Sequence, residues 1–140
     1  MPPFVHRIRV RYNECDQQDA VFNSNYLVYI DVTLTEMWRE AFGAYDAMTE
    51  MGLDLVVAEA NVRYHAPARF DDELEIAATI EKLGTTSMTT RFDITRDSAP
   101  IAIGHLRHVF VRMPQGGKTP IPDQVRATLE GYTGAATRSP

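Results

Sequence analysis

The sequence has little cysteine, no long apolar run and no excess of positive charge. Cys15 is the single cysteine among 140 residues, so an internal disulfide framework is excluded and a reducing cytoplasm is the expected compartment. No apolar run approaches the ~18 residues of a membrane span, and we expect no targeting segment or membrane contact. The formal net charge of −5 argues against nucleic acid as a partner. With 44% hydrophobic and 24% charged residues, the composition is that of an ordinary globular domain.

The predicted elements begin with one strand and one long helix. Within residues 5–12, apolar side chains at Ile8, Val10 and Tyr12 alternate with the three arginines at positions 7, 9 and 11. This period of two predicts a strand with Tyr12 on its apolar face. Residues 26–41 repeat apolar side chains at spacings of three and four, which predicts a helix capped by Asn23 or Ser24. A glycine at position 43 can end it. Many residues of this helix are β-branched, so packing against a sheet has to hold it.

Four further strands follow, joined by short turns. They are predicted at residues 53–64 with a break near Ala58, 73–82, 87–96 and 102–113. Strands connected in this way form an antiparallel sheet. Short helices are predicted before them at 45–51 and after them at 123–132. We therefore predict an α+β fold in one domain, residues 1–132, with residues 133–140 as a disordered tail.

The loop between the first strand and the long helix carries an aspartate, Asp16. On local sequence alone, such a residue is most often an Asx-turn or a helix cap. A second interpretation is chemical, because a carboxylate near a helix start joins a base or nucleophile to backbone N–H donors. A base or nucleophile and donors for the developing oxyanion are the groups that thioester hydrolysis requires. The departing thiolate has a conjugate acid with a pKa of roughly 8.5, so it leaves without a dedicated general acid.

Two segments carry a recognisable pattern. In residues 12–26, an aromatic strand end leads to an acidic-x-Asp element, a Val–aromatic pair, an Asn and a Tyr that opens the long helix. The matching residues are Tyr12, Glu14, Asp16, Val21, Phe22, Asn23 and Tyr26. In residues 64–74, an aromatic residue and then small and acidic residues precede the next strand. Together the two segments resemble the signature of hotdog-fold acyl-CoA thioesterases of the 4-hydroxybenzoyl-CoA thioesterase-like branch.

The resemblance implies a hotdog fold, in which a five-stranded antiparallel sheet wraps around one long central helix. It also implies hydrolysis of an acyl-CoA, or less readily an acyl-carrier-protein thioester, by a homodimer or homotetramer with active sites between protomers. Coenzyme A is part of the substrate, and neither a separate cofactor nor a metal is expected. Asp16 matches the catalytic carboxylate, as nucleophile or as general base, and the sequence leaves both roles open. Asn23 is the second catalytic candidate, although a helix N-cap explains it equally well.

Further site residues follow from the same resemblance. The substrate-binding candidates are Asp19, Phe22, Tyr26 and Tyr64, and the CoA-binding candidates are Lys82, Thr85, Thr86 and Ser87. Either Asp19 or Ala20 stands where the family has a glycine. Because aspartate tolerates left-handed backbone better than most residues, the turn can persist with Asp19. His105 and His108, three apart on a predicted strand, point to opposite faces and make a poor metal pair.

Three other functions stay open on the sequence. A hotdog dehydratase or hydratase normally pairs a histidine with a carboxylate, and no histidine lies in the Asp16 region or at the helix start. A non-catalytic acyl-thioester or small-ligand binding protein accounts for the missing glycine and for Asn23. A structural oligomerisation domain is the third. Thiol release from acyl-CoA separates the enzyme from the binding protein, and a ligand-dependent melting temperature separates binding from a purely structural role.

Overall fold

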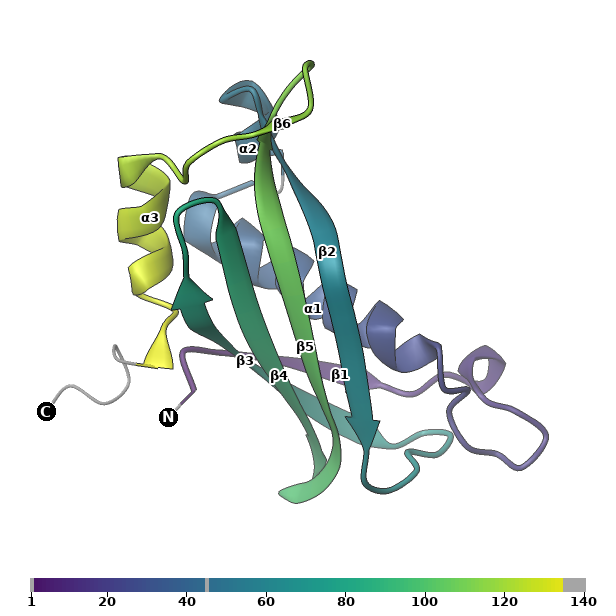
Figure 1. Cartoon of the computed structure of the whole chain (residues 1–140). Helices are drawn as coiled ribbons and strands as arrows, with labels where there is room; N and C mark the ends of the chain where they lie inside the picture. The colour runs from purple at the N-terminus through teal and green to yellow at the C-terminus, as the bar shows by residue number, and fades with distance from the viewer. Residues whose placement is uncertain (1, 45, 135–140) are drawn as a thin grey trace, which may run out of the picture.

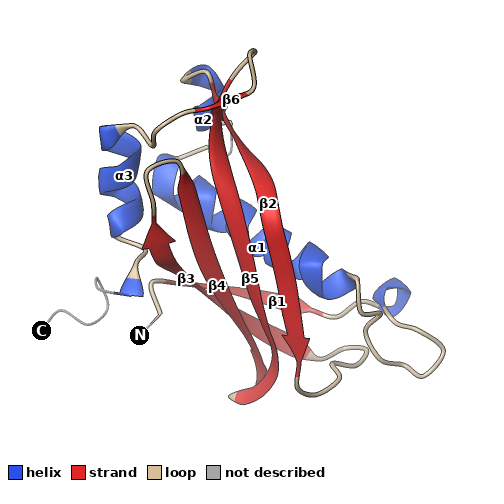
Figure 2. Ribbon diagram, viewed as in Figure 1, coloured by secondary structure: helices blue, strands red, loops and turns tan. Residues whose placement is uncertain are grey.

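A long helix lies against one face of a curled antiparallel sheet in the computed structural model, which describes residues 2–44 and 46–134 (Figure 1). The sheet has the order β1-β3-β4-β5-β2. Its strands are β1 Phe4–Arg9, β2 Leu53–Tyr64, β3 Glu73–Leu83, β4 Ser87–Arg96 and β5 Ala99–Arg112, with the short β6 Gly117–Lys118 beside β5. The helices are the 3-10 turn η1 Tyr12–Glu14, α1 Asn25–Phe42, α2 Ala47–Glu50 and α3 Asp123–Glu130. This arrangement confirms the predicted α+β fold (Figure 2).

The core forms between α1 and the inner face of the sheet. Alternate residues of β3 and β4 are buried, as the period of two requires. From α1 they meet the buried side chains Tyr26, Tyr29, Ile30, Thr33, Leu34, Met37 and Trp38. Gly104 in β5 lets the helix approach closely, because a Cβ there would collide with Cδ1 of Ile30. Gly43 ends α1 in a left-handed conformation, φ 81°, as predicted.

The two ends of α1 are held differently. Ser24 occupies the N-cap position, but its side chain makes no cap hydrogen bond within the described chain. The Asn25 side-chain amide instead donates to the carbonyl of Glu14, at 2.8 Å. The helix start is therefore tied to the preceding loop and to the sheet rather than to its own cap.

The first strand is shorter than predicted. It ends at Arg9, and the chain turns at Tyr12 into η1, where the Tyr12 ring is 78% exposed. The prediction that Tyr12 lies on the apolar face of a strand is therefore wrong. The physical reason is a local competitor, since the Glu14 carboxylate accepts the backbone N–H of Arg11 at 2.8 Å and stabilises the turn.

Two other boundaries depend on turns and on the C-terminal segment. Asp97 and Ser98 both have positive φ, 49° and 68°, so a tight two-residue turn joins β4 to β5 and β5 starts earlier than predicted. Thr133, the first residue of the predicted tail, forms a bridge to Ile80, and residues 135–140 lie outside the described chain.

Within the described chain, none of the helices combines the length and apolar character that crossing a bilayer requires.

β2 forms one edge of the sheet. It pairs with β5 alone within the described chain, so one side of a 12-residue strand keeps unpaired backbone N–H and C=O groups. The register with β5 shifts between Val57 and Glu59, which confirms the predicted break near Ala58 as a β-bulge. Val56 and Val57 are each about half exposed, at 49% and 51%. An open edge with exposed valines is typical of a surface that another chain covers.

Candidate active site

The Asp16 loop, residues 15–24, folds back on itself between η1 and α1. Cys15 and Val21 form an antiparallel bridge, and Ala20 forms another with Arg69. The backbone N–H of Val21 donates to the carbonyl of Ala68, at 2.8 Å. The loop is thus fastened to the segment that leads into β3, and it lies at the end of the molecule where α1 begins (Figure 1).

Asp16 uses one carboxylate oxygen to shape this loop. Its Oδ1 accepts the backbone N–H groups of Gln18, at 2.8 Å, and Ala20, at 3.3 Å. This is the Asx-turn that local sequence favours. The other oxygen, Oδ2, has no hydrogen-bond partner among residues 2–44 and 46–134, and the side chain is exposed in an open pocket. The structural and chemical interpretations of Asp16 are therefore compatible, because one oxygen holds the turn and the other is available to a reactant.

Asp19 takes the backbone conformation that a glycine would have taken. Its φ is 66°, and its N–H donates to the carbonyl of Asp16 at 3.1 Å. The turn therefore persists despite the departure from the family pattern. Asp16 and Asp19 line the same open pocket with Tyr12, Cys15 and Gln17. The pocket therefore contains two carboxylates.

Glu14 anchors the loop, and its role as an anchor is not apparent from the sequence. Its buried carboxylate accepts the Arg11 guanidinium at 2.7 Å and the Tyr29 hydroxyl at 2.9 Å. Burial alone would raise the pKa of Glu14, but the hydrogen bonds from Arg11 and Tyr29 outweigh it and hold this pKa below its ordinary value. The Glu14 carbonyl also accepts the backbone N–H of Phe22, at 2.9 Å. One residue thus joins η1, the Asp16 loop and the inner face of α1.

Glu14→Ala is expected to destabilise the fold by about 2–3 kcal/mol, because the buried Tyr29 hydroxyl loses its partner and η1 loses its clamp. Urea unfolding measures the effect. Glu14→Gln keeps an acceptor at the same position, so a loss of about 1 kcal/mol is expected from it. Glu73→Ala removes a carboxylate from an exposed ion pair with Arg9 and is the matched control, with an expected change under about 0.5 kcal/mol. Equal losses from Glu14→Ala and Glu73→Ala would contradict the anchoring role.

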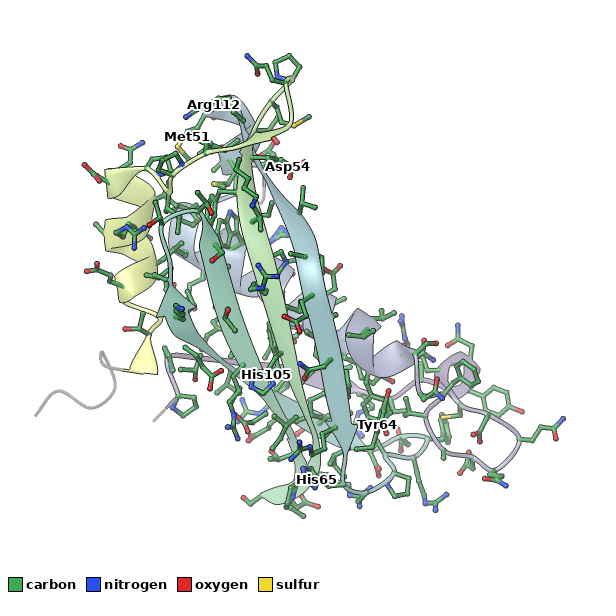
Figure 3. All side chains as sticks on the ribbon, viewed as in Figure 1. Met51, Asp54, Tyr64, His65, His105 and Arg112 are labelled. Atoms are coloured by element: carbon green, nitrogen blue, oxygen red, sulfur yellow. The ribbon has the colours of Figure 1, made fainter. Side chains whose placement is uncertain are left out.

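Three of the predicted site residues meet at the start of α1. The Tyr64 hydroxyl donates to the backbone carbonyl of Asn23 at 3.0 Å, and the rings of Tyr26 and Tyr64 are 5.2 Å apart in a T-shaped pair. Tyr26 is buried, and its hydroxyl oxygen accepts the N–H of Ala68 at 3.1 Å. Tyr64 and Phe22 are each 52% exposed, so they present ring surface to a ligand and Tyr26 supports them from the core. Figure 3 places Tyr64 at the end of β2.

The predicted CoA-binding residues lie at the other end of the sheet. Arg9 pairs with Glu73, so the chain leaves β1 for the Asp16 loop at the first residue of β3, whereas Lys82, Thr85, Thr86 and Ser87 lie where β3 ends. At about 3.3 Å per residue, the 11 residues of β3 separate these ends by roughly 33 Å. A single chain does not bring Lys82 to Asp16.

The hairpin between β3 and β4 is hydrogen-bonded to α3 and to the segment that precedes α3. The Arg126 guanidinium donates to the carbonyl of Gly84 at 2.6 Å, and the N–H of Ile121 donates to the carbonyl of Thr85 at 2.9 Å. Lys82 is exposed. The hairpin is therefore supported by the C-terminal segment, and the exposed Lys82 ammonium lies next to it.

A curled antiparallel sheet around one long helix is the hotdog fold. A solved structure of a hypothetical protein from Aquifex aeolicus superimposes with a TM-score of 0.85 at 30% identity, covering 91% of this chain and 99% of that one. This likeness extends over nearly the whole of both chains. The protein is thus a hotdog domain, as the sequence motifs imply.

Sequence comparisons give the family. Residues 18–102 match the model of the thioesterase superfamily. A putative esterase from Aquifex aeolicus is 30% identical over 128 residues, 91% of this chain and 98% of that protein. The acyl-CoA thioester hydrolase YbgC of Escherichia coli O6:H1 is 33% identical over 81 residues, 58% of this chain and 60% of that protein. The chain belongs to the thioesterase superfamily, and its enzyme class is that of the thioester hydrolases.

Proposed function

We propose that the protein hydrolyses acyl-CoA thioesters and that Asp16 is the residue that acts on the thioester. The observation that supports this most directly is the exposed Asp16 carboxylate, which has one oxygen committed to the turn and the other without a partner among the described residues. The relationship to a named acyl-CoA thioester hydrolase supports the substrate class. An acyl-carrier-protein thioester has the same reacting group and is the alternative substrate.

Two routes use the same carboxylate. As a general base, Asp16 takes a proton from water while the water oxygen bonds to the thioester carbonyl carbon; the C–S bond then breaks and the proton passes to the thiolate. As a nucleophile, Asp16 itself bonds to that carbon, the thiolate leaves, and water hydrolyses the resulting anhydride. Both routes give one carboxylic acid and one free thiol. A single turnover in ¹⁸O-labelled water tests for the nucleophilic route. When water attacks the Asp16 carbonyl carbon of the anhydride, the product leaves with an unlabelled Asp16 oxygen and Asp16 gains the label, a result that the general-base route never gives.

We propose further that the active form is a homodimer or a higher homo-oligomer, in the cytoplasm. The exposed apolar side chains Leu27, Val28 and Val32 on α1 and the open edge of β2 support an interface between copies. The roughly 33 Å along β3 between the Asp16 end and Lys82 also supports it. In such an assembly, the hairpin of a second copy supplies the CoA contacts near Asp16 of the first.

A panel of acyl-CoA substrates tests the activity. Acetyl-, octanoyl-, benzoyl- and 4-hydroxybenzoyl-CoA are incubated with the purified protein, and free thiol is measured against a no-enzyme control. Thiol release above that control supports the hydrolase, and the acyl group with the highest kcat/KM identifies the substrate class. Binding of several acyl-CoAs without thiol release would instead identify a binding protein.

Lys82→Ala is expected to raise KM for acyl-CoA by about 3- to 10-fold, because a lysine beside the hairpin forms a charge-assisted contact to a CoA phosphate. The same variant is expected to hydrolyse the corresponding acyl-pantetheine, which lacks the nucleotide, at the unchanged rate. Lys118→Ala removes the chain's other lysine and is the matched control. If Lys82→Ala raised KM equally for the acyl-CoA and for the acyl-pantetheine, Lys82 would not contact the nucleotide, and the nucleotide site would lie elsewhere.

A further inference from the structure

Residues 67–72, in the connection from β2 to β3, form the surface against which the Asp16 loop packs (Figure 1). The backbone N–H of Val21 donates to the carbonyl of Ala68 at 2.8 Å, and the N–H of Phe70 donates to the carbonyl of Asp19 at 3.4 Å. Hydrogen bonds therefore run in both directions between the two segments. A change in the shape of residues 67–72 must move the loop as well.

Arg69 extends this contact to the turn at Asp16 itself. Its guanidinium donates to the carbonyl of Gln18 at 3.2 Å, and its backbone forms a bridge with Ala20. Gln18 and Ala20 are the two residues whose N–H groups donate to Oδ1 of Asp16. Both residues that orient the Asp16 carboxylate are thus held from position 69.

The backbone of residues 71 and 72 holds the chain on the other side of Asp16. The N–H of Val10 donates to the carbonyl of Asp72 at 2.9 Å, and the N–H of Asp71 donates to the carbonyl of Val10 at 3.0 Å. Val10 is the residue after β1, and η1 and the Asp16 loop follow it. Residues 67–72 therefore contact the chain both before and after Asp16.

An ion pair between Arg96 and Asp72 fixes the shape of residues 67–72. Arg96 is the last residue of β4, and its Nη1 donates to Oδ2 of Asp72 at 2.6 Å and to the carbonyl of Pro67 at 3.2 Å. The same Asp72 oxygen accepts the backbone N–H of Arg69 at 2.8 Å. One guanidinium therefore joins the first and the last residue of the segment, and Asp72 closes a turn onto Arg69.

Asp72 is ionised at neutral pH in this arrangement. Burial alone would raise the pKa of Asp72, but hydrogen bonds from the Arg69 N–H and from Arg96, with the charge of Arg96, outweigh it and hold this pKa below its ordinary value. The two side chains are 22% and 32% exposed, so water screens them only in part. The ion pair is therefore a lasting restraint on residues 67–72.

We propose that Asp72 and Arg96 are positioning residues for Asp16: their ion pair holds residues 67–72 in the shape that keeps the Asp16 carboxylate in place. The pocket at Asp16 is lined by other residues, so the pair acts through residues 68–70 and the loop they contact. The catalytic consequence rests on the proposed role of Asp16 in hydrolysis. The structural coupling between the ion pair and the turn does not.

Arg96→Met removes the donors and the charge and keeps an unbranched side chain. Folded Arg96→Met is expected to lower kcat for acyl-CoA hydrolysis about 10- to 100-fold and to change KM less than about twofold, because a displaced carboxylate slows the chemical step and leaves the substrate contacts intact. Arg96→Lys restores the charge and a group with three donors, and it is expected to recover kcat to within about threefold of the wild type. Steady-state thiol release measures both.

Arg91→Met is the matched control. Arg91 also lies on β4 and also pairs with an aspartate, since its Nη2 is 2.9 Å from Oδ1 of Asp93. Within the described chain its side chain hydrogen-bonds to Asp93 alone, so its replacement leaves residues 67–72 unchanged. Its kcat is expected to equal that of the wild type. An equal loss from Arg91→Met and Arg96→Met would show a general effect on the sheet and overturn the proposal.

NMR spectra test the positioning without turnover. The amide resonances of Gln18 and Ala20 report their hydrogen bonds to Asp16, so they are expected to shift in folded Arg96→Met, to return in Arg96→Lys and to stay in place in Arg91→Met. The proposal is overturned if these resonances are unchanged in Arg96→Met. It is also overturned if KM rises while kcat stays the same, because the pair would then serve substrate binding.

Asp72→Asn covers the case in which Arg96→Met does not fold. The amide keeps an oxygen for the Arg69 N–H and loses the charge that holds Arg96, so the same resonance shifts and a smaller loss of kcat, about 3- to 10-fold, are expected. Wild-type spectra and wild-type kcat in folded Asp72→Asn would contradict the proposal. If the wild-type protein releases no thiol from any acyl-CoA, the proposed function fails, whereas the resonance shifts still decide the coupling.

Discussion

Asp16→Asn is expected to lower kcat for acyl-CoA hydrolysis by about 10²- to 10⁴-fold while the protein stays folded. An amide can neither take a proton from water nor attack a carbonyl at neutral pH. It does retain the side-chain oxygen that accepts the N–H groups of Gln18 and Ala20, so the turn is preserved. Asn is therefore a sharper test than Ala, which removes the turn and the charge together. Steady-state thiol release at saturating substrate measures the effect.

Asp97→Asn is the matched control for this variant. Asp97 is an exposed aspartate in the turn between β4 and β5, so its replacement by Asn removes the same charge, and Asn tolerates the positive φ of this position. Its turnover is expected to equal that of the wild type. Hydrolysis at the wild-type rate by folded Asp16→Asn would remove Asp16 from the chemistry, and Asp19 in the same pocket would be the next carboxylate to test.

The double substitution Val28→Glu with Val32→Glu is expected to convert the protein to a monomer and to lower turnover at least about 100-fold. The two valines lie one turn apart on α1 and are 52% and 40% exposed, so charges there do not disturb the core of one chain. In a symmetric dimer the same patch occurs on both copies, so four new carboxylates would face one another. Light scattering after size exclusion measures the mass, and thiol release measures the activity.

Val5→Glu provides the comparison for this variant. Val5 is 39% exposed on β1, at the opposite edge of the sheet from β2, so the same change in size and charge occurs away from the proposed interface. The expected result is an oligomer with unchanged turnover. A Val28 and Val32 double variant that is monomeric and fully active would mean that one chain holds a complete site. One that stays oligomeric and active would locate the interface on another surface.

Most of the fold could be predicted because its signals are local. The period of two in β3 and β4, the spacing of three and four along α1 and the glycine at position 43 each arise within a few residues. The error at Tyr12 had a different origin. A strand pattern continues through Tyr12, but Glu14 offers the Arg11 N–H a competing acceptor, and the Glu14 side chain is stabilised by Tyr29 fifteen positions away. Only half of a capping box forms here, because Glu14 accepts the Arg11 N–H but arginine has no acceptor to complete the pair, so the usual Ser/Thr signature is missing from the sequence.

The candidate site could be predicted in composition but not in arrangement. The motif predicted Asp16 and Asp19 as site residues, which stays a prediction, and aspartate's tolerance of positive φ anticipated the turn at Asp19. Sequence reasoning could not separate Tyr26, which is buried against Ala68, from Tyr64, which is half exposed, because both are tyrosines at helix and strand ends. Lys82 lies at the end of β3, whereas the Asp16 loop follows β1 and lies near the start of β3. The sequence does not give this separation, because it depends on the pairing of β1 with β3. His108 drew attention in the sequence as a poor metal ligand, and its burial on β5 depends on neighbours from other elements that only the structure identifies.

Glu14 also has a consequence for motion. It clamps the segment before Asp16 to Tyr29 on the inward side of α1, so the turn that carries Asp16 has no hinge that works independently of the helix. Such a turn does not swing over an incoming molecule as a lid does. Under the proposed mechanism, the Asp16 oxygen is therefore already in position when a thioester arrives. Heat that displaces Asp16 must also melt the first turns of the helix. Inactivation and unfolding should therefore share one midpoint.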